Sequence, residues 1–276
     1  MTTRLDDRPT LAPAAAAPVH AAPTGSTGGN RRLLHYLGQS LLIQLRDWAF
    51  LGFVIVMPTT VYLFFAGIFG SQPSESGPSV AALMMVTMAT YGGLGAAMNA
   101  GSQIQSERSS GWFRQLMLTA LAPGQFVLAK IATAIAVLIP AIGAVFLAGV
   151  ALGVRLEAAV WAASFALIIA ALLPMIVLGL VIGLWFKPQT ATAVTTLSML
   201  ALAMLGGLWF PLDLMPAGMQ AIGRLLPSYW ASQIGGWPLA GGEFPWQGVI
   251  VLAVWLATLA ALGGLGYRRA IRTSRR

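Results

Sequence analysis

Six long apolar runs dominate this chain and limit what it can fold into. They lie near Trp48–Gly70, Val80–Ile104, Ile131–Gly153, Ala158–Phe186, Thr190–Phe210 and Gln247–Tyr267, and none of them contains Asp, Glu, Lys, Arg or His. A helix of about 20 apolar residues crosses the roughly 30 Å hydrocarbon core of a bilayer. With 57% hydrophobic and 9% charged residues, the chain has too much apolar surface for a soluble domain. The sequence therefore predicts an all-α integral membrane protein with six transmembrane helices.

The basic residues indicate how these spans are oriented. Of the 16 Lys and Arg residues, all but Arg155 and Arg224 fall on one side of the expected membrane. This side carries the N-terminus, the connections after spans two and four, and the C-terminus. Short connections rich in Lys and Arg stay in the cytoplasm. We therefore expect a bacterial inner or plasma membrane protein with both termini cytoplasmic. The basic C-terminal tail then faces anionic lipid, and no nucleic acid is expected as a partner.

The chain divides into three parts by composition. Residues 1–30 are rich in Ala, Pro, Gly, Ser and Thr and have no apolar periodicity, which is typical of a disordered tail, here cytoplasmic. Residues 31–267 form the expected transmembrane domain, and residues 268–276 form a basic cytoplasmic tail. The chain has no cysteine, so disulfides and thiolate metal sites are excluded.

A short amphipathic segment precedes the first span. Leu34, Leu37, Leu41, Leu45 and Trp48 repeat at helical spacing, with arginine and glutamine residues between them. This pattern predicts a helix lying in the membrane interface. The alternative is a simple extension of span one.

The connection after span two carries charge and aromatic residues. Trp112 and Leu116 fall on one helical face with Phe113 beside them, and Glu107, Arg108 and Arg114 supply charge. We expect a short amphipathic helix on the cytoplasmic side. Such a helix packs either on its own protein or against a partner.

The connection after span five has a helix of its own. Pro216 is suited to begin it and Pro227 to end it. Met215, Met219, Ile222 and Leu226 form its apolar stripe. We expect this segment either to dip back into the bilayer as a re-entrant loop or to lie in the outer interface.

Polar and small residues within the spans have two interpretations. Asn99, Ser102 and Gln103 in span two, and Thr192, Thr195, Thr196 and Ser198 in span five, either line a pathway or form hydrogen bonds between helices. The Gly179–Gly183 spacing permits close approach of another helix. Kinks are expected at Pro58, Pro140 and Pro174.

The two connections resemble those of the permease family of ABC-2-type transporters, the six-helix membrane subunits of bacterial drug, lipid and polysaccharide exporters. After span two that family reads approximately E-R-x-x-G-[TW]-[LF]-x-x-L-x-x-T-P, matched here by Glu107, Arg108, Gly111, Trp112, Phe113, Leu116 and Thr119, with Ala120 in place of the usual proline. After span five it reads approximately G-x-x-F-P-x-x-x-x-P and then L-P, matched by Gly207, Phe210, Pro211, Pro216, Leu226 and Pro227. The resemblance covers the chain from about residue 31 onward.

The resemblance implies a permease that is powered by another polypeptide. It would pair with a second permease, identical or different, and with two copies of an ATP-binding subunit, on which Glu107–Thr119, Arg114 included, would dock as a coupling helix. The chain lacks a phosphate-binding loop, because neither Lys130 nor Lys187 follows the Gly-x4-Gly that such a loop needs. ATP and Mg²⁺ are therefore expected on the partner, with no cofactor and no enzyme activity in this chain.

The expected mechanism is export by alternating access. Asn99, Thr195, Thr196, Met199 and Phe210 are the candidate pathway residues, from spans two and five. Because a pathway without fixed charge suits an amphipathic molecule, the expected substrate is a drug, an antibiotic or a lipid-like compound. The alternatives are a secondary carrier driven by an ion gradient and a non-transporting membrane anchor.

Overall fold

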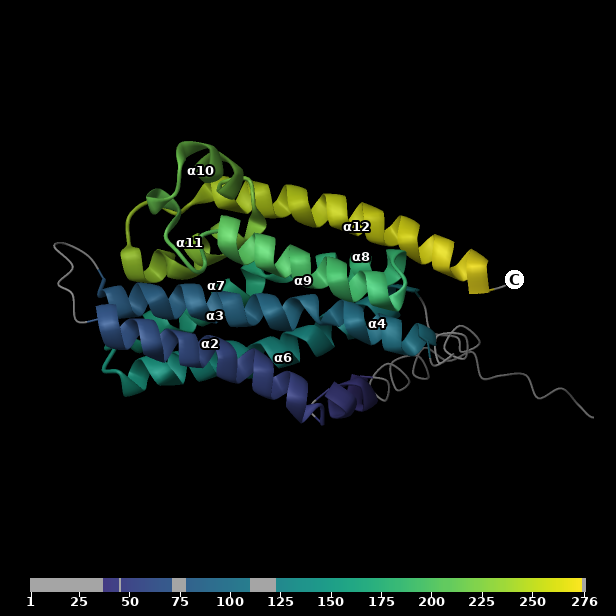
Figure 1. Ribbon diagram of the computed structural model, residues 1–276, viewed down its shortest axis with the longest axis horizontal. Coiled ribbons are helices and arrows are strands. Elements are labelled where there is room, and N and C mark those ends of the chain that lie inside the picture. Colours follow the sequence, from purple (N-terminus) through teal and green to yellow (C-terminus); the bar gives the residue numbers. More distant parts are fainter. Residues whose placement is uncertain (1–36, 45, 71–77, 110–122, 275–276) are drawn as a thin grey trace, which may run out of the picture.

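The computed structural model describes residues 37–44, 46–70, 78–109 and 123–274 of the 276-residue chain. The expected tail at residues 1–30 lies outside these residues, as do Gly111, Trp112 and the rest of the expected coupling segment up to Thr119. In the part that is described, every regular element is a helix (Figure 1). These are a helical stretch at 37–44, α2 (Trp48–Phe69), α3 (Val80–Met98), α4 (Ala100–Ser109), α6 (Pro123–Ala151), α7 (Ala158–Ala171), α8 (Leu173–Trp185), α9 (Pro188–Leu205), the 3-10 turn η1 (Leu212–Leu214), α10 (Ala217–Gly223), α11 (Pro227–Ala240) and α12 (Trp246–Ser274).

Within the described residues, six helical segments are long and apolar enough to cross a membrane, as the sequence predicts. They are α2, α3 with α4, α6, α7 with α8, α9 and α12. Two of the six are interrupted, at Asn99 and at Leu172. The second interruption lies just before Pro174, whose ring leaves no backbone N–H for a continuous helix. Pro58 and Pro140 lie inside α2 and α6, which continue past them.

The third span differs from its predicted bounds. We expected it to begin at Ile131, whereas α6 begins at Pro123. The predicted apolar run began only at Ile131 because Lys130 precedes it. In the structure, the helix includes this lysine and buries its side chain. Span three therefore contains an ionisable residue, Lys130, that lay outside the predicted span.

Helix α3 is at the centre of the bundle and contacts α2, α6, α11 and α8 (Figure 1). In the span that α3 forms with α4, 78% of the most apolar 18-residue stretch is buried inside the protein. The buried share of the corresponding stretch is 17% in α9 and 17% in α12. The small residues Ala89, Ala96 and Ala97 let these neighbours approach α3 closely, and all three are fully buried. Helices α9 and α12 are left with exposed outer faces.

Glycines in both helices allow α4 and α8 to approach each other closely. A Cβ at Gly183 would lie 2.5 Å from the backbone oxygen of Gly101 in α4, and a Cβ at Gly179 would lie 2.7 Å from that of Met98, the last residue of α3. Real Cβ atoms do not approach so closely, so neither position has room for a side chain. The predicted use of the Gly179–Gly183 spacing for close helix contact is confirmed.

The connection after α9 contains two helices rather than one. Pro216 directly precedes α10, as expected, but α10 ends at Gly223, and Pro227 begins α11 instead of ending the first helix. Helix α11 packs against α7 and α3. At its start, the hydroxyl of Ser228 donates a hydrogen bond of 2.7 Å to the carbonyl of Leu202 in α9. The prediction that Pro227 ends a helix is wrong, because proline is most favourable in the first turn, where no N–H is needed.

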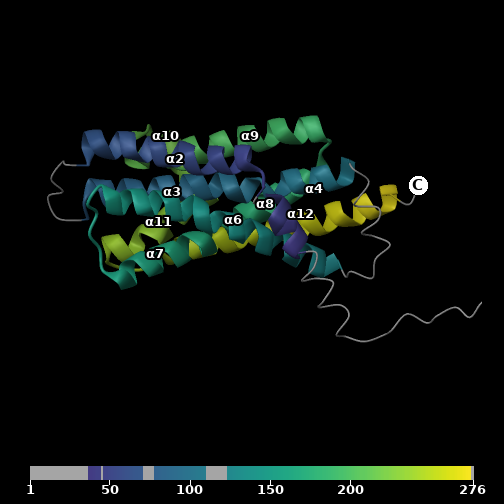
Figure 2. The ribbon, with the colours of Figure 1, turned by 90° about the horizontal axis from the view of Figure 1, so that it is seen from below.

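One end of the bundle, here called the polar end, collects several segments that are distant in sequence. It is formed by residues 37–44, the end of α4, the starts of α6 and α9, and the end of α12, as the two views in Figures 1 and 2 agree. Helices α10 and α11 lie toward the opposite end. The chain thus enters and leaves the described bundle at the same end.

Candidate functional site

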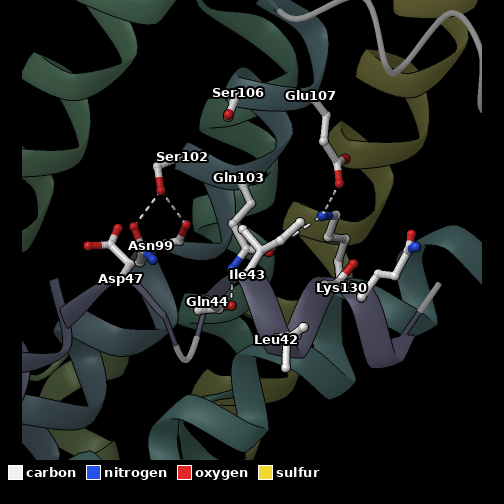
Figure 3. Close-up of a pocket in the computed structure, with 12 residues that line it drawn as sticks. Leu42, Ile43, Gln44, Asp47, Asn99, Ser102, Gln103, Ser106, Glu107 and Lys130 are labelled. Carbon is white, nitrogen blue, oxygen red and sulfur yellow. Dashed lines mark hydrogen bonds and ion pairs between the residues drawn. The ribbon is translucent and has the colours of Figure 1, made fainter. Parts of the chain in front are cut away.

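A pocket of about 640 Å³ opens at the polar end (Figure 3). Three segments line it. They contribute Gln39, Ser40, Leu42, Ile43, Gln44 and Asp47 from the chain before α2, then Asn99, Ser102, Gln103, Ser106 and Glu107 from the junction of α3 with α4 and from α4, and Lys130 from α6. Amides and hydroxyls predominate, which is unusual so close to apolar spans. The pocket is therefore the strongest candidate for a site in the described part of the chain.

The helical stretch 37–44 forms one wall of the pocket because of how its side chains are distributed. Ser40 and Gln44, one turn apart, are 8% and 4% exposed and face the bundle. Leu42 and Ile43 remain exposed. A face that buries polar side chains requires polar partners, and the pocket provides them.

This stretch is separate from α2. The Asp47 carboxylate accepts a hydrogen bond of 3.1 Å from the backbone N–H of Phe50, so Asp47 caps α2 and marks its start. The chain does not continue as one helix, which excludes the simple extension of span one. The predicted stripe from Leu34 to Trp48 was wrong at its end, since Trp48 belongs to α2 and is 78% exposed.

An ion pair lies deepest in the pocket. The ammonium of Lys130 is 2.6 Å from a carboxylate oxygen of Glu107, and their side chains are 1% and 16% exposed. The ammonium also lies 5.8 Å from the ring centre of Phe126. Burying two charges costs several kcal/mol each, and their attraction offsets this cost only when they are paired this closely. Glu107, expected at the coupling surface, thus has a partner within its own chain.

Amide side chains extend this ion pair toward the stretch 37–44. Gln103 accepts a hydrogen bond of 3.4 Å from Lys130 and donates one to the side-chain oxygen of Gln44. Figure 3 shows the resulting row from Glu107 through Lys130 and Gln103 to Gln44. The row joins α4, α6 and the stretch 37–44 through side chains alone.

The other side of the pocket holds Asn99, Ser102 and Asp47. The hydroxyl of Ser102 donates to the backbone oxygen of Asn99 at 2.7 Å and also contacts its side-chain oxygen.

The side-chain nitrogen of Gln44 is buried and has no hydrogen-bond partner among the residues that the structure describes. A buried donor of this kind is costly unless a ligand or water accepts from it.

The candidate pathway residues do not gather at a single cavity in the described part. Thr195, Thr196 and Met199 lie on α9, Asn99 lies between α3 and α4 at the polar end, and Phe210 follows α9 and is 56% exposed. The hydroxyls of Thr192 and Thr196 donate to backbone oxygens of α9 itself, at 3.1 and 3.0 Å. These two threonines therefore form no hydrogen bond between helices here.

The residues of the outer motif mark the turns of the connection after α9. Gly207 has a φ of +73°, which a residue with a side chain rarely adopts. Pro211 precedes η1, Pro216 precedes α10, and Leu226 and Pro227 begin α11. The motif positions thus coincide with the places where the backbone changes direction.

Sequence reasoning missed Gln44 and Lys130 as site residues. Lys130 carried a usable signal, because it is a single cation within the otherwise apolar segment Pro123–Ala151. Gln44 carried none, since a glutamine in an amphipathic helix is ordinarily placed in solvent. Across the part of the chain that the structure describes, no group of three His, Cys, Asp or Glu side chains is placed to hold a metal ion.

Comparison with known proteins agrees with this architecture. Residues 32–234 match the family model of the ABC-2 type transporter. The chain is also 30% identical over 215 residues to the "Putative transport permease YvfS" of Bacillus subtilis (strain 168), covering 77% of this chain and 87% of that protein. In this family the permease is a membrane subunit without its own cofactor, and ATP and Mg²⁺ belong to the partner ATPase. The chain belongs to the ABC-2 type transporter family, as a membrane permease that works with an ATP-binding subunit.

Proposed function

We propose that this permease exports an amphipathic drug, antibiotic or lipid-like molecule from the cytoplasm or the inner leaflet by alternating access. The observation that carries this proposal is the chemistry of the six spans. Within the membrane-spanning stretches Trp48–Phe69, Val80–Glu107, Gly124–Ala151, Ala158–Trp185, Pro188–Leu205 and Trp246–Gly266, the Asp, Glu, Lys, Arg and His residues are Glu107 and Lys130, and these two pair with each other at the polar end. The rest of the spans offers apolar surface and hydroxyls, which suits an amphipathic molecule better than an ion.

The energy comes from a separate ATP-binding subunit that docks on the connection between α4 and α6. The docking residues are Arg108, Gly111, Trp112, Phe113, Arg114, Leu116 and Thr119, with Glu107 at their base. Glu107 lies near the end of α4 and Lys130 lies inside α6, and their ion pair joins these two helices. Two helices joined in this way would move together when the ATPase pushes on either of them.

Two permeases and two ATP-binding subunits form the complete exporter. Helix α9 supports a second permease, because it is the least apolar of the six spans and yet only 17% of it is buried. Thr196 is exposed on this helix, and Thr195 is half-buried. Hydroxyls and an open face fit better against a partner or a substrate pathway than against lipid.

The pathway runs along α9, from Asn99 at the polar end past Thr195, Thr196 and Met199 to Phe210. Gly207, Pro211, Pro216, Leu226 and Pro227 shape its outer exit, where α10 and α11 turn back toward the bundle. The polar end faces the cytoplasm of a bacterial inner membrane, because the basic residues of the sequence concentrate in the segments that end there.

Reconstitution with its cognate ATP-binding subunit tests the proposal. Proteoliposomes that contain both chains should move a fluorescent amphipathic amine or a labelled lipid on addition of ATP and Mg²⁺. Liposomes with the permease alone should show neither transport nor ATP hydrolysis. Transport by the permease alone, driven by an imposed proton or sodium gradient, would instead establish the secondary carrier and overturn the proposal.

A further inference from the structure

We propose that the pocket at the polar end binds the headgroup of a zwitterionic phospholipid that carries a primary amine, such as phosphatidylethanolamine. One side chain of the pocket recognises a phosphate or ester oxygen of the lipid headgroup, and a second side chain recognises the headgroup ammonium. The assignment to the inner leaflet rests on the orientation under the proposed function. The chemistry of binding does not depend on it.

The first point of recognition is Gln44. Its side-chain oxygen is occupied by Gln103, whereas its nitrogen is buried without a partner among the described residues. Since Gln44 is 4% exposed and lines the pocket, a ligand there would need a hydrogen-bond acceptor for this nitrogen. Phosphate and ester oxygens are such acceptors, and a bare amine is not.

The second point is Asp47. It is exposed at the edge of the pocket, three residues along the chain from Gln44, and it forms no salt bridge to a described residue. Of the three charged residues that line the pocket, Glu107 and Lys130 pair with each other, so the charge left over is the carboxylate of Asp47. A headgroup with net negative charge is repelled there, and a terminal ammonium is attracted.

The depth of the pocket matches the headgroup layer. Asp47 directly precedes Trp48, which begins the first span and is 78% exposed. Tryptophan at the end of a span sits at the membrane interface. Leu42 and Ile43, 52% and 73% exposed on the same wall, provide apolar contact for the glycerol and upper acyl chain. A volume of about 640 Å³ is within the range of about 300–1,000 Å³ that small-ligand sites span.

Lipid titration of the purified full-length chain, followed by native mass spectrometry, tests this site. Phosphatidylethanolamine and phosphatidylglycerol with identical acyl chains are the probes, and dodecylamine tests recognition of an amine alone. We expect one phosphatidylethanolamine to bind more tightly than either other probe, by up to about fivefold over phosphatidylglycerol, the size that one exposed ion pair supports.

Two substitutions separate the two points of recognition. Asp47→Asn retains the cap of α2, because asparagine caps as well as aspartate, but removes the charge, so the preference over phosphatidylglycerol should disappear. Gln44→Glu keeps an oxygen for Gln103 and removes the buried nitrogen, which should weaken phosphatidylethanolamine binding by about tenfold. The matched controls are Asp213→Asn and Gln233→Glu, both exposed and outside the pocket, and they should bind like the wild type.

The proposal is overturned if the wild type binds the two lipids equally, if dodecylamine binds as tightly as phosphatidylethanolamine, or if both pocket variants bind like their controls. The assay needs neither ATP nor a partner subunit. A failure here therefore leaves the exporter proposal intact, and a failure of ATP-driven transport leaves the lipid site intact.

Discussion

The ammonium of Lys130 and the carboxylate of Glu107 meet at 2.6 Å, although the 22 intervening residues include the connection between α4 and α6. Lys130 is the more deeply buried partner, with its side chain 1% exposed against 16% for Glu107. The pair joins two spans at the polar end and closes the base of the segment proposed to receive the ATPase. Its contribution to folding and its contribution to coupling can therefore be measured separately.

Glu107→Gln should destabilise the chain more than Lys130→Met does. The first change leaves the nearly inaccessible ammonium of Lys130 without its counter-charge, which typically costs about 3–5 kcal/mol. The second leaves the Glu107 carboxylate, on a side chain that is 16% exposed against 1% for Lys130. The midpoint of thermal unfolding of the purified chain in detergent measures both effects. Glu243→Gln, an exposed substitution at the opposite end, is the matched control, and equal midpoints for Glu107→Gln and Glu243→Gln would contradict the structural role of the pair.

Gly179→Ala should weaken the contact of α8 with the end of α3, next to its junction with α4. The added methyl would meet the backbone oxygen of Met98 at 2.7 Å, and moving a helix backbone to relieve such overlap costs about 1–3 kcal/mol. Gly67→Ala is the control, since no heavy atom lies within 4 Å of its Cβ in α2. There alanine should be neutral or stabilise the chain by up to about 1 kcal/mol. If both variants lose the same stability in the same detergent assay, the close approach of α8 to the end of α3 is wrong.

The fold followed from the sequence wherever a single physical quantity decided it. Hydropathy placed six spans because length and apolarity suffice to identify a helix in a bilayer. Helix α11 escaped this reasoning, because its 14 residues are too few to cross a membrane and include Gly235, Gly236 and Pro238. It is positioned by packing on α7, where Ile168 leaves no space for a side chain at Gly235.

The polar pocket was less predictable than the spans. The sequence named Glu107, Asn99 and Gln103, but assigned the first to a partner surface and the other two to a pathway or to helix packing. Which residue meets Lys130 depends on how α4 and α6 are rotated about their axes. That rotation is set by many small contacts across the bundle, and no local pattern records it.

Reporter fusions should place the two ends of the bundle on opposite sides of the membrane. Fusions after Gln72, in the sequence between α2 and α3, and after Gly241, between α11 and α12, should report the outside. Fusions after Arg114 and Arg276 should report the cytoplasm, because the basic residues stay there. A phosphatase that is active only outside, compared with a fluorescent protein that folds only inside, gives the readout. Cytoplasmic fluorescence at Gly241 would contradict the six-span topology.

Trp112→Ala should separate docking from folding at the proposed ATPase surface. Glu107 is unsuitable for this purpose, because its substitution also disturbs the buried Lys130. An aromatic anchor at the centre of an interface typically contributes about 2 kcal/mol or more, so its truncation should weaken association with the ATP-binding subunit by more than about tenfold. The measurements are co-purification with that subunit, its permease-stimulated ATP hydrolysis, and efflux.

Trp246→Ala, which removes a tryptophan that is 69% exposed at the start of α12, is the matched control and should retain all three. Thermal unfolding in detergent, without the ATPase, then decides between the two roles of Trp112. A midpoint within error of wild type, together with lost co-purification, supports docking. A fall in the midpoint as large as that of Glu107→Gln would mean that Trp112 packs on its own chain, in which case the ATP-binding subunit must contact this permease elsewhere.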